Sequence, residues 1–507
     1  MRRGHFANNL IANVANFAFT TAFAIWLIPY LVRHLGVAAY GLYPLANGIT
    51  SYLALFTMAI TSAVGRSMTM ALDQGESDEA NRIFNTSFWS TAGILLVLLV
   101  PTVWLSFHAS SFFNVPPGAD GDFSWLMLAV AGAFFVSTLS FPFGISAFAH
   151  NRFDILSALN IVNTVARVLV IVALFNLFRP HVWHVGSGVL FGTTCASLCT
   201  VIVWRKLTPN LEISWSWVSL HALKNMTKMG GWLVVNNLGA LLFVSIDLIV
   251  VNRVVGITAT GEYGAVMTWS VFFRAFAGVL AGVFAPSIFI LFSRNDVSGL
   301  VHCSRRAVKF VGLVMALPIG LVCGLSRPLL QLWLGDPFVV FAPLLSLMTF
   351  HLCVNLAITP LFNVEVAVNR VRVPGIVTCV IGAMNVGLAA LLAGPIGWGV
   401  YGVAAAGAIL LTGKNLLFTP IYAAHILGLE WSAFYGEIVP VAGTTTAIAG
   451  LGWACTRWLP IDSWPFLVLI GVMFSVGALS FIYGVLLDDT ERAYALRTFW
   501  PRGSQPA

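Results

Sequence analysis

The chain has 507 residues, of which 59% are hydrophobic and only 9% are charged. Soluble proteins carry about 25% charged residues, so this composition excludes a soluble globular protein and indicates an integral membrane protein. The formal net charge of +7 does not indicate nucleic-acid binding, because the basic residues cluster in short loops, as membrane orientation requires.

Apolar runs near the length of about 20 residues that a membrane helix needs predict fourteen spans. The first six lie near 8–31, 40–65, 86–106, 123–148, 155–177 and 183–204. After a polar interruption at 205–228, eight more lie near 229–252, 263–292, 309–334, 338–366, 373–394, 400–428, 434–456 and 464–487. The predicted fold class is an all-α integral membrane protein with about 14 transmembrane helices.

The positions of Lys and Arg predict the side of the membrane on which each loop lies. If the N-terminus is cytoplasmic, cytoplasmic segments hold 18 of these residues, and outer loops hold Arg33, Arg179, Arg253, Arg327 and Arg457. Such a bias predicts that both termini are cytoplasmic. The longest outer loop, 107–122, is too short to hold a catalytic domain, so no catalytic residues are expected.

Two similar segments suggest an internal repeat. "GVAAYGLY" at 36–43 and "GITATGEY" at 256–263 match at four positions with an offset of 220 residues. Their places in the topology predict two six-helix bundles that are parallel repeats about an axis along the membrane normal, although glycine-rich turn chemistry alone also explains the match. The predicted domains are an N-terminal bundle, a cytoplasmic linker, a C-terminal bundle, and two added helices with a cytoplasmic tail, at 1–204, 205–228, 229–428 and 429–507.

Polar residues spaced by three and four positions mark single faces of two predicted helices. Two bundles that face each other leave a cleft, where transporters of this build bind cargo, and such faces are candidates to line it. The alternative is hydrogen bonding between packed helices or, for Arg167, a buried pair with a carboxylate or with carbonyls. The candidate residues are Asn9, Asn13 and Asn16 in the first span and Asn160, Asn163 and Arg167 in the fifth.

Positive charge exceeds negative charge within and beside the spans. A charged side chain at the centre of a bilayer costs at least several kcal/mol, so each one needs a compensating partner. The cations Arg66, Arg167, Arg274 and Lys414 face only the acids Asp247 and Glu365. The surplus predicts an anionic passenger, and phosphate suits the planar guanidinium group. The cysteine and histidine spacings complete no metal site, so neither a metal nor a cofactor is expected.

Two segments resemble a known family. The stretch 31–88 is similar to the N-terminal region of Wzx-like polysaccharide (oligosaccharide-lipid) flippases of the MOP superfamily, and "IDLIVVNRVVGITATGEYGA" at 246–265 resembles a signature of their second half. The matching positions are Gly36, Tyr40, Gly41, Arg66, Asn81 and Arg82 in the first stretch, and Asp247, Gly256, Gly261 and Tyr263 in the second.

The resemblance implies a flippase of the plasma (inner) membrane that moves an undecaprenyl-pyrophosphate-linked oligosaccharide by alternating access, for surface polysaccharide biosynthesis. It implies that Arg167, Arg274 and Lys414 contact pyrophosphate or sugar and that Arg66 guards the inner mouth. The five asparagines would bind glycan hydroxyls, and Asp247 and Glu365 would be either ion-coupling sites or counter-charges. The implied partners are the lipid-linked glycan and membrane lipids, with a polysaccharide polymerase and a chain-length regulator as further candidates.

Other functions remain in competition. A cation-coupled multidrug or small-molecule exporter of the same superfamily is the main alternative, although its members often place an acidic residue in the first span and this chain has none there. The Arg and Asn pattern of peptidoglycan-precursor flippases near the first span is also missing, which argues against lipid II as cargo. A membrane-embedded glycan polymerase or ligase would need a larger outer loop.

Overall fold

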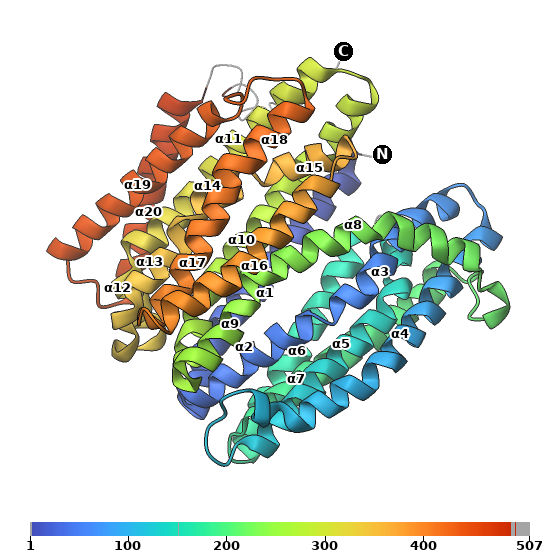
Figure 1. The fold of residues 1–507 in the computed structure, drawn as a ribbon, viewed down its shortest axis with the longest axis horizontal. Helices are drawn as coiled ribbons and strands as arrows, with labels where there is room; N and C mark the ends of the chain where they lie inside the picture. Colours follow the sequence, from blue (N-terminus) through green and yellow to red (C-terminus); the bar gives the residue numbers. More distant parts are fainter. Residues whose placement is uncertain (1–2, 151, 488–491, 493–507) are drawn as a thin grey trace. The chain divides into compact units, whose positions relative to one another are not determined.

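The computed structural model describes residues 3–150, 152–487 and 492, which form helices joined by short turns and contain no β-strand (Figure 1). Within this part of the chain, 13 helices are long and apolar enough to cross a membrane. The number is 14 if the pair Val234–Val244 and Ile246–Val255, bent by 45° at a short break, counts as one span. The prediction of an all-α membrane protein with about 14 spans is confirmed.

The helices pack into two compact units. Unit 1 contains residues 1–265 and 371–410, and unit 2 contains residues 266–370 and 411–507. The two units are defined by contacts between helices. They do not test whether the two halves of the sequence are repeats of each other. The four predicted domains and the parallel-repeat relation therefore stay predictions.

Unit 1 contains the first seven long helices and part of the second half of the chain. Two helices, α10 (Ile257–Ser293) and α17 (Gly399–Gly413), begin in unit 1 and end in unit 2. The other elements of unit 1 are α1 (Arg3–Leu35), α2 (Val37–Ser51), α3 (Ala54–Asp73), α4 (Ser77–Phe112), α5 (Asp120–Ala149), α6 (Phe153–Leu177), α7 (Val182–Leu207), η1 (Trp215–Trp217), α8 (Leu220–Val244), α9 (Ile246–Val250), η2 (Val251–Val255) and α16 (Arg372–Ala393).

Aromatic side chains fill the core of unit 1 where α4, α5 and α7 meet. Trp204 on α7 is fully buried, and its ring centroid lies 5.3 Å from that of Phe84 and 5.0 Å from that of Phe143. Stacked and edge-to-face rings contribute beyond their buried area. This cluster fixes α4 beside α5 and α7.

Unit 2 is organised around α11 (Val297–Gly324) and α19 (Tyr435–Trp458), which pack closely because their contact contains small residues. A Cβ atom added to Gly324 would lie 2.9 Å from the Cα atom of Gly452. The other elements are α12 (Ser326–Leu334), η3 (Asp336–Phe341), α13 (Ala342–Phe350), α14 (Leu352–Ala357), α15 (Thr359–Ala367), η4 (Lys414–Phe418), α18 (Thr419–Ile426), α20 (Trp464–Phe481) and η5 (Ile482–Leu486).

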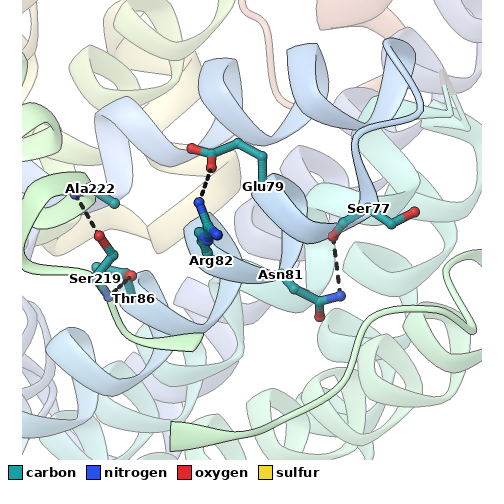
Figure 2. Close-up of polar contacts among 7 residues, drawn as sticks. All are labelled: Ser77, Glu79, Asn81, Arg82, Thr86, Ser219 and Ala222. Atoms are coloured by element: carbon teal, nitrogen blue, oxygen red, sulfur yellow. Dashed lines mark hydrogen bonds and ion pairs between the residues drawn. The ribbon is translucent and has the colours of Figure 1, made fainter. Parts of the chain in front are cut away.

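The predicted cytoplasmic linker is held against the start of α4, which Figure 2 shows in part. Asn81 accepts a hydrogen bond from the backbone N–H of Glu212 at 2.9 Å, and Asn85 accepts one from Ser214 at 2.8 Å. Asn85 also donates to the carbonyl of Glu212 at 2.8 Å. Thr86 accepts from the N–H of Ser219, the residue that caps α8, at 3.0 Å. The side chains of α4 therefore satisfy backbone groups of the linker that lie outside its helical turns.

The two matching glycine segments contact each other inside unit 1. A Cβ atom added to Gly41 on α2 would lie 2.6 Å from the backbone nitrogen of Gly261 on α10. Gly36 and Gly256, which precede these two helices, have φ angles of +80° and +125°, a region that glycine adopts without strain. Glycine is therefore needed at the contact for its small size and before each helix for its backbone conformation.

Candidate functional site

Arg167 lies on α6 at a close contact with α7. A Cβ atom added to Gly192 would lie 2.9 Å from the backbone nitrogen of Arg167, and one added to Gly188 would lie 2.9 Å from its carbonyl oxygen. Small residues on α7 thus hold the backbone of α6 in place at this residue. The side chain of Arg167 is half-buried, and its Nε atom is buried without a hydrogen-bond partner among the described residues.

The alternative explanation for Arg167, a buried pair with a carboxylate, has no support among the described residues. Arg167 takes part in none of the ion pairs found among the described residues, such as those of Arg82 with Glu79, Arg152 with Asp154, and His181 with Asp122. A guanidinium has five N–H donors in a fixed fork that matches carboxylate and phosphate oxygens. Arg167 is therefore suited to accept an anion from outside the chain.

The helices that carry the two asparagine faces, α1 and α6, pack against each other. Asn16 is half-buried, and its Oδ1 atom is buried without a donor among the described residues. Asn163 is half-buried and Asn160 is exposed. Asn9 and Asn13 lie on α1, but their side chains fall outside the described part of the structure, as does the side chain of Arg66 on α3.

Asp247 lies in a buried polar cluster of unit 1. Its side chain is 8% exposed and accepts a hydrogen bond from the hydroxyl of Tyr263 at 2.9 Å. Asn385 on α16 donates to Asp247 at 3.4 Å, while its own Oδ1 atom has no donor among the described residues. Gly407 on α17 leaves room beside them, since its added Cβ atom would lie 3.8 Å from both Asp247 Oδ2 and Asn385 Oδ1. The cluster therefore presents several oxygen atoms in an apolar interior.

A second polar cluster lies in unit 2, where a broken helix meets a π-helical turn. Asn355 donates to Thr412 at 3.1 Å and accepts from Asn415 at 2.9 Å. Its helix, α14, is separated from α13 and α15 at His351 and Ile358. Breaks and π-turns of this kind often mark functional positions in helices.

Lys414 and Glu365 are both buried in unit 2, at 6% and 4% exposure. The Nζ atom of Lys414 lies 5.1 Å from the ring centroid of Phe362, a cation–π contact. The Oε1 atom of Glu365 has no hydrogen-bond partner among the described residues, and no ion pair within 4 Å joins Glu365 to Lys414. Arg274 on α10 is half-buried in the same unit.

The predicted site residues thus fall into two groups, one in each unit. Unit 1 holds the asparagine faces, Arg66, Arg167 and Asp247, whereas unit 2 holds Arg274, Lys414 and Glu365. Sequence reasoning missed Asn385, which is the partner of Asp247. An asparagine alone in the apolar stretch "GAMNVGL" was a usable signal, because polar residues inside a span usually have a partner.

Comparison with known proteins gives one family match and two named relatives. Residues 7–292 match the family described as "Polysaccharide biosynthesis protein". A protein of Bacillus subtilis (strain 168) named "Uncharacterized membrane protein EpsK" is 34% identical over 97% of this chain and 98% of that protein. A protein of Shigella flexneri named "Putative O-antigen transporter" is 21% identical over 66% of this chain and 77% of that protein.

Solved structures share the fold at low sequence identity. The lipid II flippase MurJ in an inward closed conformation has a TM-score of 0.62 and 13% identity, covering 94% of this chain and all of MurJ. A multidrug resistance MATE family transporter of the MOP superfamily, in an inward-facing conformation, has a TM-score of 0.59 and 13% identity, covering 86% of this chain and 95% of the transporter. These likenesses identify the MOP-superfamily fold.

Proposed function

Because the chain belongs to the polysaccharide biosynthesis protein family, we propose that it is a flippase for an undecaprenyl-pyrophosphate-linked oligosaccharide repeat unit. In this proposal it carries the repeat unit across the plasma (inner) membrane by alternating access, without catalysing a chemical step. The chain is a multi-pass membrane protein, its family is described as "Polysaccharide biosynthesis protein", and one relative is named "Putative O-antigen transporter". The observation that chiefly supports this cargo is the Nε atom of Arg167, which is buried without a hydrogen-bond partner among the described residues.

Pyrophosphate is the chemical group that best matches Arg167. A half-buried guanidinium without a carboxylate partner among the described residues needs an anion, and phosphate oxygens form two parallel hydrogen bonds with its planar fork. Each charge-assisted hydrogen bond contributes roughly 1.5–3 kcal/mol. This energy offsets part of the free-energy cost of moving the charged head group out of water.

The remaining predicted residues are assigned supporting roles in this proposal. Arg274 and Lys414 provide further positive charge for pyrophosphate or sugar, and Arg66 guards the inner mouth. The side chains of Asn9, Asn13, Asn16, Asn160 and Asn163 offer donors and acceptors to glycan hydroxyls. Glu365 acts as a counter-charge to Lys414, since both are buried in unit 2. Both chain termini face the cytoplasm, and a polysaccharide polymerase and a chain-length regulator act on the exported product.

Asp247 is the candidate coupling residue. A carboxylate beside the oxygen atoms of Tyr263 and Asn385 is suited to a proton or a small hard cation, which prefers oxygen ligands. The same cluster is the one observation that favours the alternative function, a cation-coupled small-molecule exporter. Drug efflux that depends on Asp247 in a sensitised host, without an effect on surface polysaccharide, would favour that alternative.

The proposal is tested by substituting Arg167 in cells that make the polysaccharide. We expect Arg167→Ala to lower export by at least about tenfold, because lost charge-assisted hydrogen bonds of this size correspond to such a factor. Arg167→Lys should retain part of the export, because it keeps the charge but loses the planar fork. Surface polysaccharide is measured by immunoassay and normalised to the amount of membrane-inserted protein.

Arg179→Ala is the matched control, because Arg179 is an exposed arginine between α6 and α7 without a described partner. It should export as the wild type does. Full export by Arg167→Ala at normal protein level would remove this residue from the mechanism.

A further inference from the structure

A pocket of about 400 Å³ opens on unit 2. Its lining residues come from α12, from η3, from α19 and from the turn between α19 and α20, and Figure 1 shows where these helices lie. The elements that form it are far apart in sequence, at 327–339 and 453–462. Both segments contain a loop that the distribution of Lys and Arg predicts to be on the outer side of the membrane. The pocket is therefore separate from the polar clusters assigned to transport.

The charge of the pocket is mostly positive. Arg327 and Arg457 both line it, with Asp462 as the single acidic residue of the lining. Both arginines are exposed, and neither forms an ion pair with a described carboxylate. The guanidinium carbon of Arg457 lies 5.1 Å from the ring centroid of Trp453, so the tryptophan orients the guanidinium from one face. Two guanidinium groups that line one pocket, one of them oriented by a tryptophan, suit phosphate oxygens.

The same pocket has an apolar floor. Ile461 is 4% exposed and Pro328 is buried, and both line the pocket beside the charged residues. A ligand that fills this pocket would combine an anionic group with an apolar portion. A free inorganic anion would leave the apolar floor in contact with water, which is unfavourable.

Exposed tryptophans place the pocket at the level of lipid head groups. Trp453 is 56% exposed, Trp458 is 85% exposed and Trp464 is 44% exposed, and all three lie at the ends of α19 and α20. Tryptophan is enriched at the boundary between membrane and water, where its ring lies among the head groups. A phosphate group held by the two arginines would therefore be at the depth of a lipid phosphate.

We propose that this pocket binds the phosphate of an anionic lipid head group at the outer membrane surface. Arg327 and Arg457 hold the phosphate, Gln331 offers hydrogen bonds to the polar part of the head group, and the apolar floor contacts the glycerol portion. Gln331 is already held in place, since its side-chain nitrogen donates to Asp336 at 2.9 Å. This site does not depend on the cargo that the protein transports.

Native mass spectrometry of the purified full chain with phosphatidylglycerol tests the proposal. We expect the double variant Arg327→Gln/Arg457→Gln to bind its tightest phosphatidylglycerol molecule at least about tenfold more weakly than the wild type, because charge-assisted hydrogen bonds are lost. Asp462→Asn should bind it more tightly, because a repulsive charge is removed. Both changes alter exposed side chains, so folding should be retained, and a thermal melting curve verifies this.

The matched control is Arg33→Gln/Arg179→Gln, which removes two exposed arginines from other loops predicted to be on the outer side. It should bind phosphatidylglycerol as the wild type does. Equal weakening in both double variants would contradict the proposal, because it would show a non-specific effect of net charge. Displacement of the lipid by inorganic phosphate at equal concentration would also contradict it, since the ligand would then be a free anion.

Discussion

Substitution of Asp247 is the clearest single-residue test of ion coupling. Asp247→Asn keeps an acceptor for the Tyr263 hydroxyl but removes the charge on which cation or proton binding depends. We expect normal protein level and transport that no longer responds to an imposed proton or sodium gradient. Initial transport rates in membrane vesicles, with and without each gradient, are the measurement.

Tyr263→Phe is the informative companion to that variant. It removes the 2.9 Å hydrogen bond but leaves the carboxylate and Asn385 in place, so the response to the gradient should persist in weakened form. If Asp247→Asn responds to gradients as the wild type does, Asp247 is a counter-charge and not a coupling site.

The contact between α2 and α10 depends on the absence of a side chain at Gly41. Gly41→Ala places a Cβ atom 2.6 Å from the backbone nitrogen of Gly261, so the helices must separate. Overpacking of this kind costs typically about 1–3 kcal/mol, and we expect a lower melting temperature in detergent. Gly93→Ala on α4 is the control, because an added Cβ atom there meets no atom within 4 Å, and alanine is favoured in helices. Equal melting temperatures for the two variants would show that the close contact does not contribute to stability.

The hydrogen bonds between α4 and the linker should slow hydrogen exchange in the linker. Asn85→Ala removes two hydrogen bonds to Glu212 and Ser214, with a net loss of about 1 kcal/mol each. We expect faster amide hydrogen exchange in residues 210–216, measured by mass spectrometry, while α6 and α7 exchange as before. Asn176→Ala is the control, since Asn176 is exposed and its side chain donates to the carbonyl of Val172 in its own helix. Unchanged exchange in Asn85→Ala would mean that other contacts hold the linker.

Helices were easier to predict from the sequence than the contacts between them. Hydropathy and length predict the spans because each apolar run must satisfy its own backbone in lipid. The breaks at His351 and Ile358 and the π-turn that begins at Lys414 were not predictable, because neighbouring helices satisfy the freed backbone groups. Asn85 likewise bonds a segment 127 residues away, and no local pattern in the sequence encodes such a contact.

The roles assigned to the predicted site residues stay predictions, because contacts between helices decide which of these residues lie together. Charge placed Lys414 among the candidate residues, and the structure shows it buried in unit 2. The partners Asn385 and Thr412 were missed, because each is a single polar residue within an apolar helix and has no periodicity of its own. Charge counting identified the surplus of cations in the spans but did not show that the Nε atom of Arg167 lacks a partner among the described residues.

The whole molecule combines the fold of the solved MOP-superfamily transporters with a cation in its first unit, Arg167, whose Nε atom lacks a partner among the described residues. In the proposed function a lipid-linked glycan would supply an anion for Arg167, whereas a cationic drug would add to the positive charge. The nature of the cargo therefore separates the two candidate functions of the protein as a whole.

Transport by the purified protein in liposomes tests this account most directly. The liposomes contain a fluorescent undecaprenyl-pyrophosphate-linked oligosaccharide, and a membrane-impermeant quencher reports its movement between leaflets. The account predicts movement by the wild type that falls at least about tenfold in Arg167→Ala and is unchanged in Arg179→Ala. Movement at the rate of protein-free liposomes, together with uptake of a cationic dye by the same preparation, would contradict it.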